Sequence, residues 1–362
     1  MNNYRFSTGN EIIELPLQPD VRKVYLEITT ECNFSCVTCI RHSWSDRIGA
    51  MADTTFAGIM ASLEDLPQVE TIHFGGFGEP LTHPRILDML AVCKRAGSKV
   101  EMITNGSLLT ADISRNLIDI PLDWLYVSLD GPSAECFGKV RPGADYDAVI
   151  ENVAGLQQLK KASGRKLPRL GIEFVATKTN FASLPAMRRT VDALGAEKFI
   201  VTNILPYHAS MKDEILYDKD VSLDGFGHES VLLASKISPN MKLRTLRNCK
   251  FVNDKAIAVT EDGGVCPCYA YMHNYKCYIL GREKEIHAHH FGNVNERSLA
   301  DIWTDPKFAV FRWIVRNSQY PSCTDCRQVD GCRMADSNEA DCWGNQPSCG
   351  DCLWARELIA CP

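Results

Sequence analysis

Hydrophobic and polar positions alternate from the start of the chain to about residue 205 in a way that predicts strands and helices in turn. The predicted strands are short runs rich in β-branched and aromatic residues, bounded by turn residues. They are Val24–Thr29, Thr71–Phe74, Val100–Ile103, Trp124–Leu129, Gly171–Ala176 and Phe199–Leu205. Apolar residues at helical spacing fill the segments between them.

Two of the predicted helices follow a capping residue, the first after Asp53 or Thr54 and a later one after Asp145. The pair His83-Pro84 predicts another helix start, because proline costs little at an early helical position. The apolar positions at i, i+3, i+4 and i+7 are Phe56, Ile59, Met60 and Leu63 in the first helix, and Tyr146, Val149, Ile150 and Val153 in the later one. Six strand–helix units predict an α/β fold with a parallel sheet and a functional site at the carboxyl ends of its strands.

Composition favours an intracellular metal-binding enzyme. The first twenty residues are polar and acidic rather than signal-like, and no apolar run approaches the length of a membrane span. Sixteen cysteines in such a chain favour metal ligation over disulfides. A net charge of −6 gives no support for nucleic-acid binding. We therefore expect a cytoplasmic protein with neither a nucleic-acid partner nor a membrane partner.

The cysteines divide the chain of 362 residues into two modules. Five lie before position 150, none lies between 137 and 248, and eleven fall in the last 114 residues. Cys93 is in helical register with Ile86 and Met89, and Cys136 stands alone. Both are predicted to be small buried hydrophobic residues.

Three cysteines, Cys32, Cys36 and Cys39, follow the first predicted strand. Three thiolates leave one iron of a 4Fe–4S cube open to a further ligand, so such a cube can do chemistry as well as carry electrons. The alternative is a structural zinc site with His42 as the fourth ligand.

This C-x3-C-x2-C segment resembles the signature of the radical S-adenosylmethionine (radical SAM) superfamily. The resemblance implies that the open iron binds the amino and carboxylate groups of S-adenosylmethionine (SAM). An electron from the cube would then cleave the sulfonium bond and release a 5′-deoxyadenosyl radical. It also implies a partial (β/α)6 barrel over residues 21–235, after an N-terminal extension of residues 1–20.

Several polar motifs lie at the ends of the predicted strands. The segment Phe74-Gly-Gly-Phe-Gly-Glu-Pro80 resembles the GGEP motif of the family, in which a carboxylate accepts hydrogen bonds from the SAM ammonium group. The cofactor-binding residues that the resemblance implies are Gly76, Gly78, Glu79, Asn105, Ser128, Asp130 and Arg141. For these residues, ordinary turns and a solvated loop arginine are the alternatives. Thr38 replaces the usual aromatic residue, so adenine must stack elsewhere.

The C-terminal cysteines resemble the SPASM extension of radical SAM enzymes, which binds two auxiliary iron–sulfur clusters. Cys249, Gly263-x4-Cys268 and Cys323-x2-Cys326-x5-Cys332 follow its outline, but the position three residues after Cys332 is Asp336. The resemblance implies a cysteine-rich iron–sulfur domain over residues 245–362. Zinc ribbons, which also use paired cysteines, are the alternative.

Chain order predicts two auxiliary 4Fe–4S clusters. The first ligand set is Cys249, Cys266, Cys268 and Cys342; the second is Cys323, Cys326, Cys332 and a closing cysteine, Cys352 in preference to Cys349. The alternatives to Cys342 are Asp336 as an oxygen ligand or one iron left open, and Cys361 is a further cysteine in this region. The remaining Cys277 and the histidines His273, His287, His289 and His290 are predicted to lie in a solvated surface loop.

These resemblances predict a radical SAM enzyme that modifies a protein or peptide and receives electrons from a flavodoxin- or ferredoxin-type donor. Segments 39–44, 203–207 and 341–354 resemble the maturases associated with tungsten-containing oxidoreductases. Asn203 and Tyr207 are the candidates for substrate contact. One alternative is an enzyme that forms a crosslink, thioether or epimer in a ribosomal peptide. The other is an iron–sulfur electron carrier or scaffold without radical chemistry.

Overall fold

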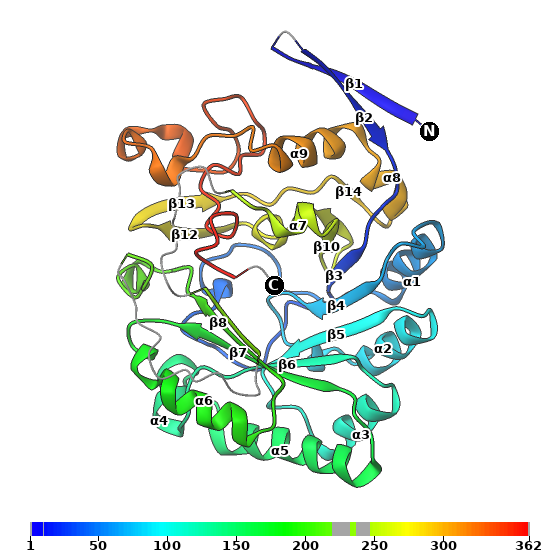
Figure 1. The fold of residues 1–362 in the computed structure, drawn as a ribbon, viewed down its shortest axis with the longest axis vertical. Helices are drawn as coiled ribbons and strands as arrows, with labels where there is room; N and C mark the ends of the chain where they lie inside the picture. Colours follow the sequence, from blue (N-terminus) through cyan, green and yellow to red (C-terminus); the bar gives the residue numbers. More distant parts are fainter. Residues whose placement is uncertain (1, 10, 219–231, 237–246, 361–362) are drawn as a thin grey trace.

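A mostly parallel sheet forms the centre of the protein. The structure is a computed structural model that describes residues 2–9, 11–218, 232–236 and 247–360. Within these residues the sheet has ten strands in the order β14-β11-β10-β3-β4-β5-β6-β7-β8-β9. Figure 1 shows the sheet curving, with helices along its outer side. The strands are β3 (Lys23–Glu27), β4 (Thr71–Gly75), β5 (Lys99–Thr104), β6 (Trp124–Ser128), β7 (Arg169–Ala176), β8 (Lys198–Asn203), β9 (Leu232–Lys236), β10 (Ala256–Val259), β11 (Gly264–Cys266) and β14 (Gly292–Asn293).

The six predicted strands correspond to β3 through β8, and each of them pairs in parallel with the next. The central residues of β3, β4 and β6 are buried, as expected for strands covered on both faces. Along β5 and β8, buried residues alternate with partly buried ones. The predicted partial barrel is confirmed, and the carboxyl ends of its strands meet at one edge. The helices between the strands are α1 (Asp53–Ser62), α2 (Ile86–Arg95), α3 (Ala111–Asp119), α4 (Ala134–Val140), α5 (Tyr146–Ser163) and α6 (Leu184–Ala193).

The predicted helix starts are right in one case and displaced in two. Asp145 caps α5 by accepting a hydrogen bond from the Ala148 N–H at 3.1 Å. At α1 the N-cap is Ala52, because Asp53 is already helical and its carboxylate pairs with Arg85 at 2.7 Å. Helix α2 begins at Ile86, two residues beyond Pro84.

The C-terminal cysteine-rich segment extends the barrel sheet, which the sequence did not predict. Strand β10 pairs in parallel with β3, and the short strands β11 and β14 follow it in antiparallel pairs. The four residues of β10 are fully buried, but this run is too short to stand out as a strand in the sequence. The predicted domain limits, 21–235 and 245–362, stay predictions.

The remaining elements surround this end of the sheet. Strands β12 (Tyr275–Ile279) and β13 (Arg282–Ile286) form a hairpin, and α7 (Lys250–Asn253), α8 (Leu299–Trp303) and α9 (Pro306–Arg316) pack nearby (Figure 1). The N-terminal extension is also a hairpin, of β1 (Asn2–Thr8) and β2 (Glu11–Leu17). Its Phe6 ring lies 5.3 Å from the ring of Trp313 on α9, so it is anchored to the C-terminal module.

The two cysteines outside the motifs differ. Cys93 is fully buried on α2, as predicted. Cys136 is only partly buried on α4, so the prediction that it is a core residue is wrong. Within the described residues, no helix combines the length and the apolar character that crossing a bilayer requires.

Candidate active site

The loop after β3, residues 28–42, carries the three cysteines of the first motif and is held by hydrogen bonds within the loop and to the end of α4. The Arg41 side chain donates to the carbonyls of Phe34 at 2.7 Å and Thr30 at 3.4 Å. The Val37 N–H donates to the carbonyl of Val140 at the end of α4. We call this segment the cysteine loop. Its contacts place Cys32, Cys36 and Cys39 above the carboxyl end of the barrel.

The three thiols are partly buried. Burial raises the pKa of Cys36 to about 11 and also raises the pKa of Cys32. Metal binding must therefore displace thiol protons, as it does wherever thiolates ligate. The Cys39 sulfur accepts from Arg41 Nε at 3.5 Å, and the Cys32 sulfur accepts from the Phe34 N–H at 3.4 Å. These donors can stabilise the thiolate form.

The spacing of the donors is wider than zinc requires. In the part of the chain that the structure describes, no three cysteine sulfurs lie mutually within 4.8 Å. A tetrahedral zinc site would hold them about 3.8 Å apart. His42 Nε2 contacts the carbonyl of Cys36 at 3.1 Å and the Ser35 hydroxyl at 3.3 Å. The loop therefore fits a larger cluster held by three thiolates better than a zinc ion completed by His42.

Glu79 lies at the carboxyl end of β4 and is 2% exposed. Its carboxylate accepts hydrogen bonds from the Thr104 hydroxyl at 2.7 Å, the Asn105 N–H at 2.6 Å and the Leu81 N–H at 3.1 Å. Burial raises the pKa of Glu79, and these hydrogen bonds oppose the rise. A carboxylate oriented this way is a suitable acceptor for an ammonium group.

The glycines before Glu79 are needed for close packing of the chain against itself. A Cβ on Gly78 would lie 2.1 Å from the Thr29 carbonyl oxygen. Gly76 has φ +104°, and a Cβ there would lie 2.5 Å from Glu27 Cγ. Gly76 and Gly78 were predicted as cofactor-binding residues. The structure gives a further reason for glycine at both positions, the approach of the β4 loop to the end of β3.

We expect Gly78→Ala to disrupt this approach. Because the new methyl group meets backbone rather than a flexible side chain, the substitution should cost about 1–3 kcal/mol or more. Gly138→Ala is the matched control, since Gly138 on α4 has open space at its Cβ position. Thermal unfolding followed by anaerobic circular dichroism should show a lower midpoint for Gly78→Ala alone. Equal midpoints for the two variants would contradict this account of the motif.

Asp130 and Arg141 form a buried ion pair beside the cysteine loop. Arg141 donates from Nε at 2.9 Å and Nη2 at 2.7 Å to Asp130 Oδ2. Asp130 Oδ1 accepts from the Val175 N–H at 2.9 Å. The positive charge of Arg141 lowers the pKa values of Cys36 and Glu79, against the larger effect of burial. Arg141 is thus already paired within the chain, and Asp130 orients it.

Asn105 links the cysteine loop to Glu79. Its side-chain nitrogen donates to Asn33 Oδ1 at 2.9 Å and lies 3.8 Å from the Cys32 sulfur, while its backbone N–H donates to Glu79. Ser128 lies partly buried at the end of β6. The structure thus places the predicted cofactor-binding residues at the ends of β4, β5 and β6 and, for Arg141, at the end of α4, near the cysteine loop.

A second group of cysteines lines an internal cavity of the C-terminal module. Five cysteines line it, Cys277 of β12 and the four others Cys249, Cys268, Cys349 and Cys352, together with aromatic side chains that include Tyr271 and Tyr275. The Tyr271 hydroxyl lies 3.5 Å from the Cys349 sulfur. Burial raises the pKa of Cys352, and the neighbouring Cys249 raises it further. We call this the four-cysteine cavity, after the four cysteines other than Cys277.

The cysteines are grouped in part differently from the ligand sets that chain order predicted, because Cys349 and Cys352 join Cys249 and Cys268 at the cavity. Cys266 is fully buried in a small core with Tyr25 and Tyr269, against which Cys249 and Cys268 also pack, and its sulfur faces the Gly264 carbonyl at 3.8 Å. Cys342 is exposed and lies near enough to Cys323 to raise its pKa, to which burial contributes most. Spacing along the chain could not predict this, because the turn of residues 349–352 folds back into the cavity.

The other cysteines of this region lie toward the surface. Cys326 is exposed, Cys323 and Cys332 are partly buried, and Asp336 is exposed. Cys361 lies outside the described residues. With Cys277 left out, the cavity contributes four cysteines, and Cys323, Cys326, Cys332 and Cys342 make a second group of four.

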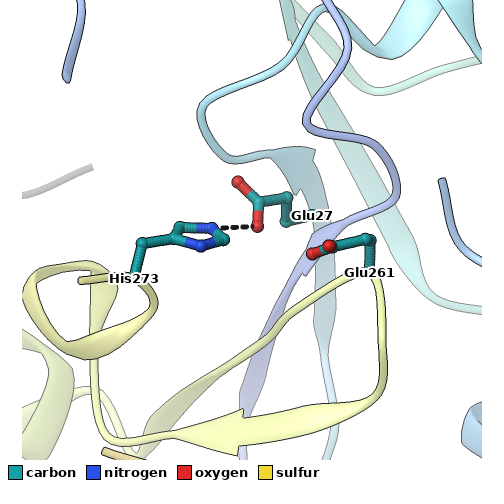
Figure 2. A group of neighbouring side chains, drawn as sticks. All are labelled: Glu27, Glu261 and His273. Atoms are coloured by element: carbon teal, nitrogen blue, oxygen red, sulfur yellow. Dashed lines mark hydrogen bonds and ion pairs between the residues drawn. The ribbon is translucent and has the colours of Figure 1, made fainter. Parts of the chain in front are cut away.

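The prediction of a solvated loop is wrong for His273 and Cys277. His273 is 3% exposed and Cys277 is 1% exposed. His273 lies beside Glu27 and Glu261, as Figure 2 shows. Glu27 was visible in the sequence as a charged residue inside an apolar strand, a signal that the sequence analysis did not use.

The predicted substrate-contact residues lie between the two modules. The Asn203 side chain donates to the Leu358 carbonyl at 2.7 Å. The Tyr207 ring lies 5.7 Å from the ring of Tyr275, on the side of the four-cysteine cavity. They join the end of β8 to the C-terminal segment.

Comparison with known proteins agrees with this geometry. A family model of the radical SAM superfamily matches residues 26–164, and a model of the SPASM iron–sulfur cluster-binding domain matches residues 249–327. The chain is 37% identical over 350 residues to a "tungsten-containing aldehyde ferredoxin oxidoreductase cofactor-modifying protein" of Pyrococcus furiosus, covering 94% of this chain and 97% of the relative. It is 25% identical to a PqqA peptide cyclase of Gluconobacter oxydans, covering 85% and 84% of the two chains.

Solved structures share the fold. SuiB of Streptococcus suis bound to S-adenosylmethionine superposes with a TM-score of 0.62 at 16% identity, covering 88% of this chain and 73% of that one. The enzyme anSMEcpe, with bound AdoMet and a peptide, gives a TM-score of 0.60 at 16% identity, covering 94% and 96%. The two family matches imply 4Fe–4S clusters and SAM as cofactors. With its cysteine loop, partial barrel and C-terminal cysteines, the chain belongs to the radical SAM superfamily and carries a SPASM domain.

Proposed function

We propose that this enzyme modifies a protein or peptide substrate during the maturation of a tungsten-containing oxidoreductase. The observation that carries the proposal is the 37% identity to the Pyrococcus furiosus cofactor-modifying protein, which extends over nearly the whole of both chains. The segments around Cys39, Asn203 and Asp341 that resemble such maturases support the same assignment.

In this proposal the chain's residues bind and orient the cofactors. Cys32, Cys36 and Cys39 hold the catalytic cluster, and Arg41 and Asn105 donate toward their sulfurs. A 4Fe–4S cluster bound there would supply the electron for reductive cleavage of SAM. Glu79 accepts the SAM ammonium group while its Thr104 and Asn105 partners keep it in place. Asp130 holds the guanidinium group of Arg141 in place beside the site.

The two auxiliary clusters have ligand sets that follow the spatial grouping. One set is Cys249, Cys268, Cys349 and Cys352 of the four-cysteine cavity. The other is Cys323, Cys326, Cys332 and Cys342, of which the first and last lie close together. Cys266 is a core residue in this assignment. A flavodoxin- or ferredoxin-type electron donor, a cytoplasmic location and the absence of a nucleic-acid partner remain predictions.

A ribosomal-peptide substrate is the second candidate. The identity to a PqqA peptide cyclase over 85% of the chain favours it. An electron carrier without radical chemistry is the third candidate, and the oriented Glu79 carboxylate disfavours it.

The test is anaerobic incubation of the reconstituted, reduced enzyme with SAM and the apo form of a co-purifying tungsten oxidoreductase, followed by mass analysis of that protein. A mass change that requires SAM supports the maturase proposal. A change confined to a short precursor peptide would support the second candidate. If SAM is not cleaved in either mixture, the electron carrier is the better description.

Glu79→Gln tests the placement of SAM. The amide keeps the size of the side chain but removes the charge that an ammonium group needs, so SAM affinity should fall about tenfold or more. Leu87→Met, a volume-conserving change at a partly buried position of α2 that packs against the barrel core, is the control. Equilibrium dialysis of SAM against anaerobically reconstituted protein measures the affinity. Unchanged affinity at full cluster content would mean that Glu79 does not contact SAM.

A further inference from the structure

Two carboxylates and an imidazole meet where the C-terminal module joins the barrel sheet. Glu27 is the last residue of β3, and Glu261 lies two residues beyond the end of β10. These strands are parallel neighbours, so their carboxyl ends lie at the same edge of the sheet. His273, which follows the short helix of residues 269–271, reaches the same point from the other side (Figure 2). Three segments that are distant in sequence thus converge there.

The three side chains have the spacing of metal ligands. Their nearest ligand atoms all lie within 4.8 Å of one another, and His273 Nε2 lies 2.6 Å from Glu27 Oε2. A metal ion with bonds of about 2.1 Å holds neighbouring ligand atoms about 3.0–3.5 Å apart. Small side-chain shifts would therefore bring all three onto one ion. In the part of the chain that the structure describes, no other group of three ligating side chains is this compact.

The ring of His273 is oriented in the way that is typical of metal-binding histidines. Its other ring nitrogen, Nδ1, lies 3.0 Å from Asp46 Oδ2. Asp46 is held in turn by Asn274, whose backbone N–H donates at 2.9 Å and whose side-chain amide donates at 2.7 Å. A carboxylate behind the imidazole fixes the tautomer with a proton on Nδ1, which leaves Nε2 free to bind a metal.

Glu261 provides a separate indication of a missing partner. Its Oε2 atom is buried and has no hydrogen-bond partner among the described residues. Buried polar atoms are rarely left unpaired in native proteins, and each exception calls for a bound group or a functional reason. Glu27, Asp46 and Glu261 also bring three carboxylates to one imidazole, so a cation would reduce the excess of buried negative charge.

We propose that Glu27, Glu261 and His273 bind one divalent cation, with Asp46 as the outer partner of the histidine. Two carboxylates and an imidazole suit Mn²⁺, Fe²⁺ or Zn²⁺. Glu261 and His273 line a cleft of about 540 Å³, so the remaining coordination positions can take water or an oxygen ligand from that cleft. Glu27 Oε1 also accepts from the Phe77 N–H at 2.8 Å, which connects this ion to the loop that carries Glu79.

The probe is Mn²⁺ alone, added to holoenzyme whose clusters are fully loaded and whose other metals have been removed with a chelator. The room-temperature electron paramagnetic resonance signal of free Mn²⁺ disappears on binding, so it counts bound ions. We expect one Mn²⁺ per chain, displaced by Zn²⁺. Asp46→Asn should weaken binding about 10–100-fold, and Glu261→Gln should weaken it at least about tenfold.

Glu296→Gln, an exposed residue away from the cleft, is the matched control and should bind Mn²⁺ as the wild type does. Iron content and circular dichroism establish that each variant is folded. The wild-type titration needs no variant: if fully loaded holoenzyme binds no Mn²⁺, the group is a hydrogen-bonded imidazolium and the proposal is wrong. Binding that Asp46→Asn and Glu261→Gln leave unchanged would be adventitious and would equally overturn it.

Discussion

Cys36→Ala should abolish reductive cleavage of SAM while leaving the iron–sulfur signals of the C-terminal module in place. A 4Fe–4S cluster bound by three thiolates has no spare protein ligand, so loss of one should dismantle it. We expect 5′-deoxyadenosine formation to fall at least about a thousandfold. Iron analysis should show about four irons fewer per chain than in the wild type.

Cys136→Ala is the matched control for this experiment. Cys136 is partly buried on α4, the helix whose end contacts the cysteine loop, and it belongs to neither cysteine set. Its replacement should leave iron content and SAM cleavage unchanged. Appreciable cleavage by Cys36→Ala, or an equal loss in both variants, would contradict the assignment of the cysteine loop.

Cys352→Ala and Cys266→Ala should differ sharply in iron content. Cys352 lines the four-cysteine cavity, so its loss should remove about four irons per chain, whereas Cys266→Ala should keep them. Cys266 is the more deeply buried of the two, so loss of packing alone would harm Cys266→Ala more. We expect Cys352→Ala to cleave SAM without modifying the substrate, because the barrel site is intact while the auxiliary site is not.

Anaerobic iron analysis and electron paramagnetic resonance of the two variants measure the difference. Circular dichroism must first show that both are folded, since structural metals also stabilise small domains. Loss of iron from Cys266→Ala but not from Cys352→Ala would instead support the ligand sets that chain order predicts, in which Cys266 is a ligand. If a folded Cys352→Ala variant that lacks the cluster modified the substrate fully, the cluster in this cavity would not be needed for the reaction.

The barrel could be predicted from the sequence because each of its strands and helices is marked by residues that are close together along the chain. Apolar runs such as Val100–Ile103 and capped helices such as the one after Asp145 are read within a few residues. The three cysteines of the first motif were predictable for the same reason, since all of them belong to one loop. Strand β10 was missed because its four residues become a strand only by pairing with β3, more than two hundred residues earlier.

The C-terminal sites depend on contacts that spacing does not encode. The turn that carries Cys349 and Cys352 folds back against Tyr271, and this contact decides which thiols share a cavity. His273 was placed on the surface because its segment is polar, yet Glu27 and Asp46 bury it. Each of these errors concerns a partner that is distant along the chain.

Hydrogen transfer from substrate to cofactor tests the central claim most directly. The apo form of the partner tungsten oxidoreductase would be prepared from cells grown on deuterated nutrients and incubated in ordinary buffer with reduced enzyme and SAM. We predict 5′-deoxyadenosine that carries deuterium and forms only when enzyme, reductant and SAM are all present. Unlabelled 5′-deoxyadenosine alone would contradict the maturase proposal, and none at all, from protein of full iron content, would contradict radical chemistry by this chain.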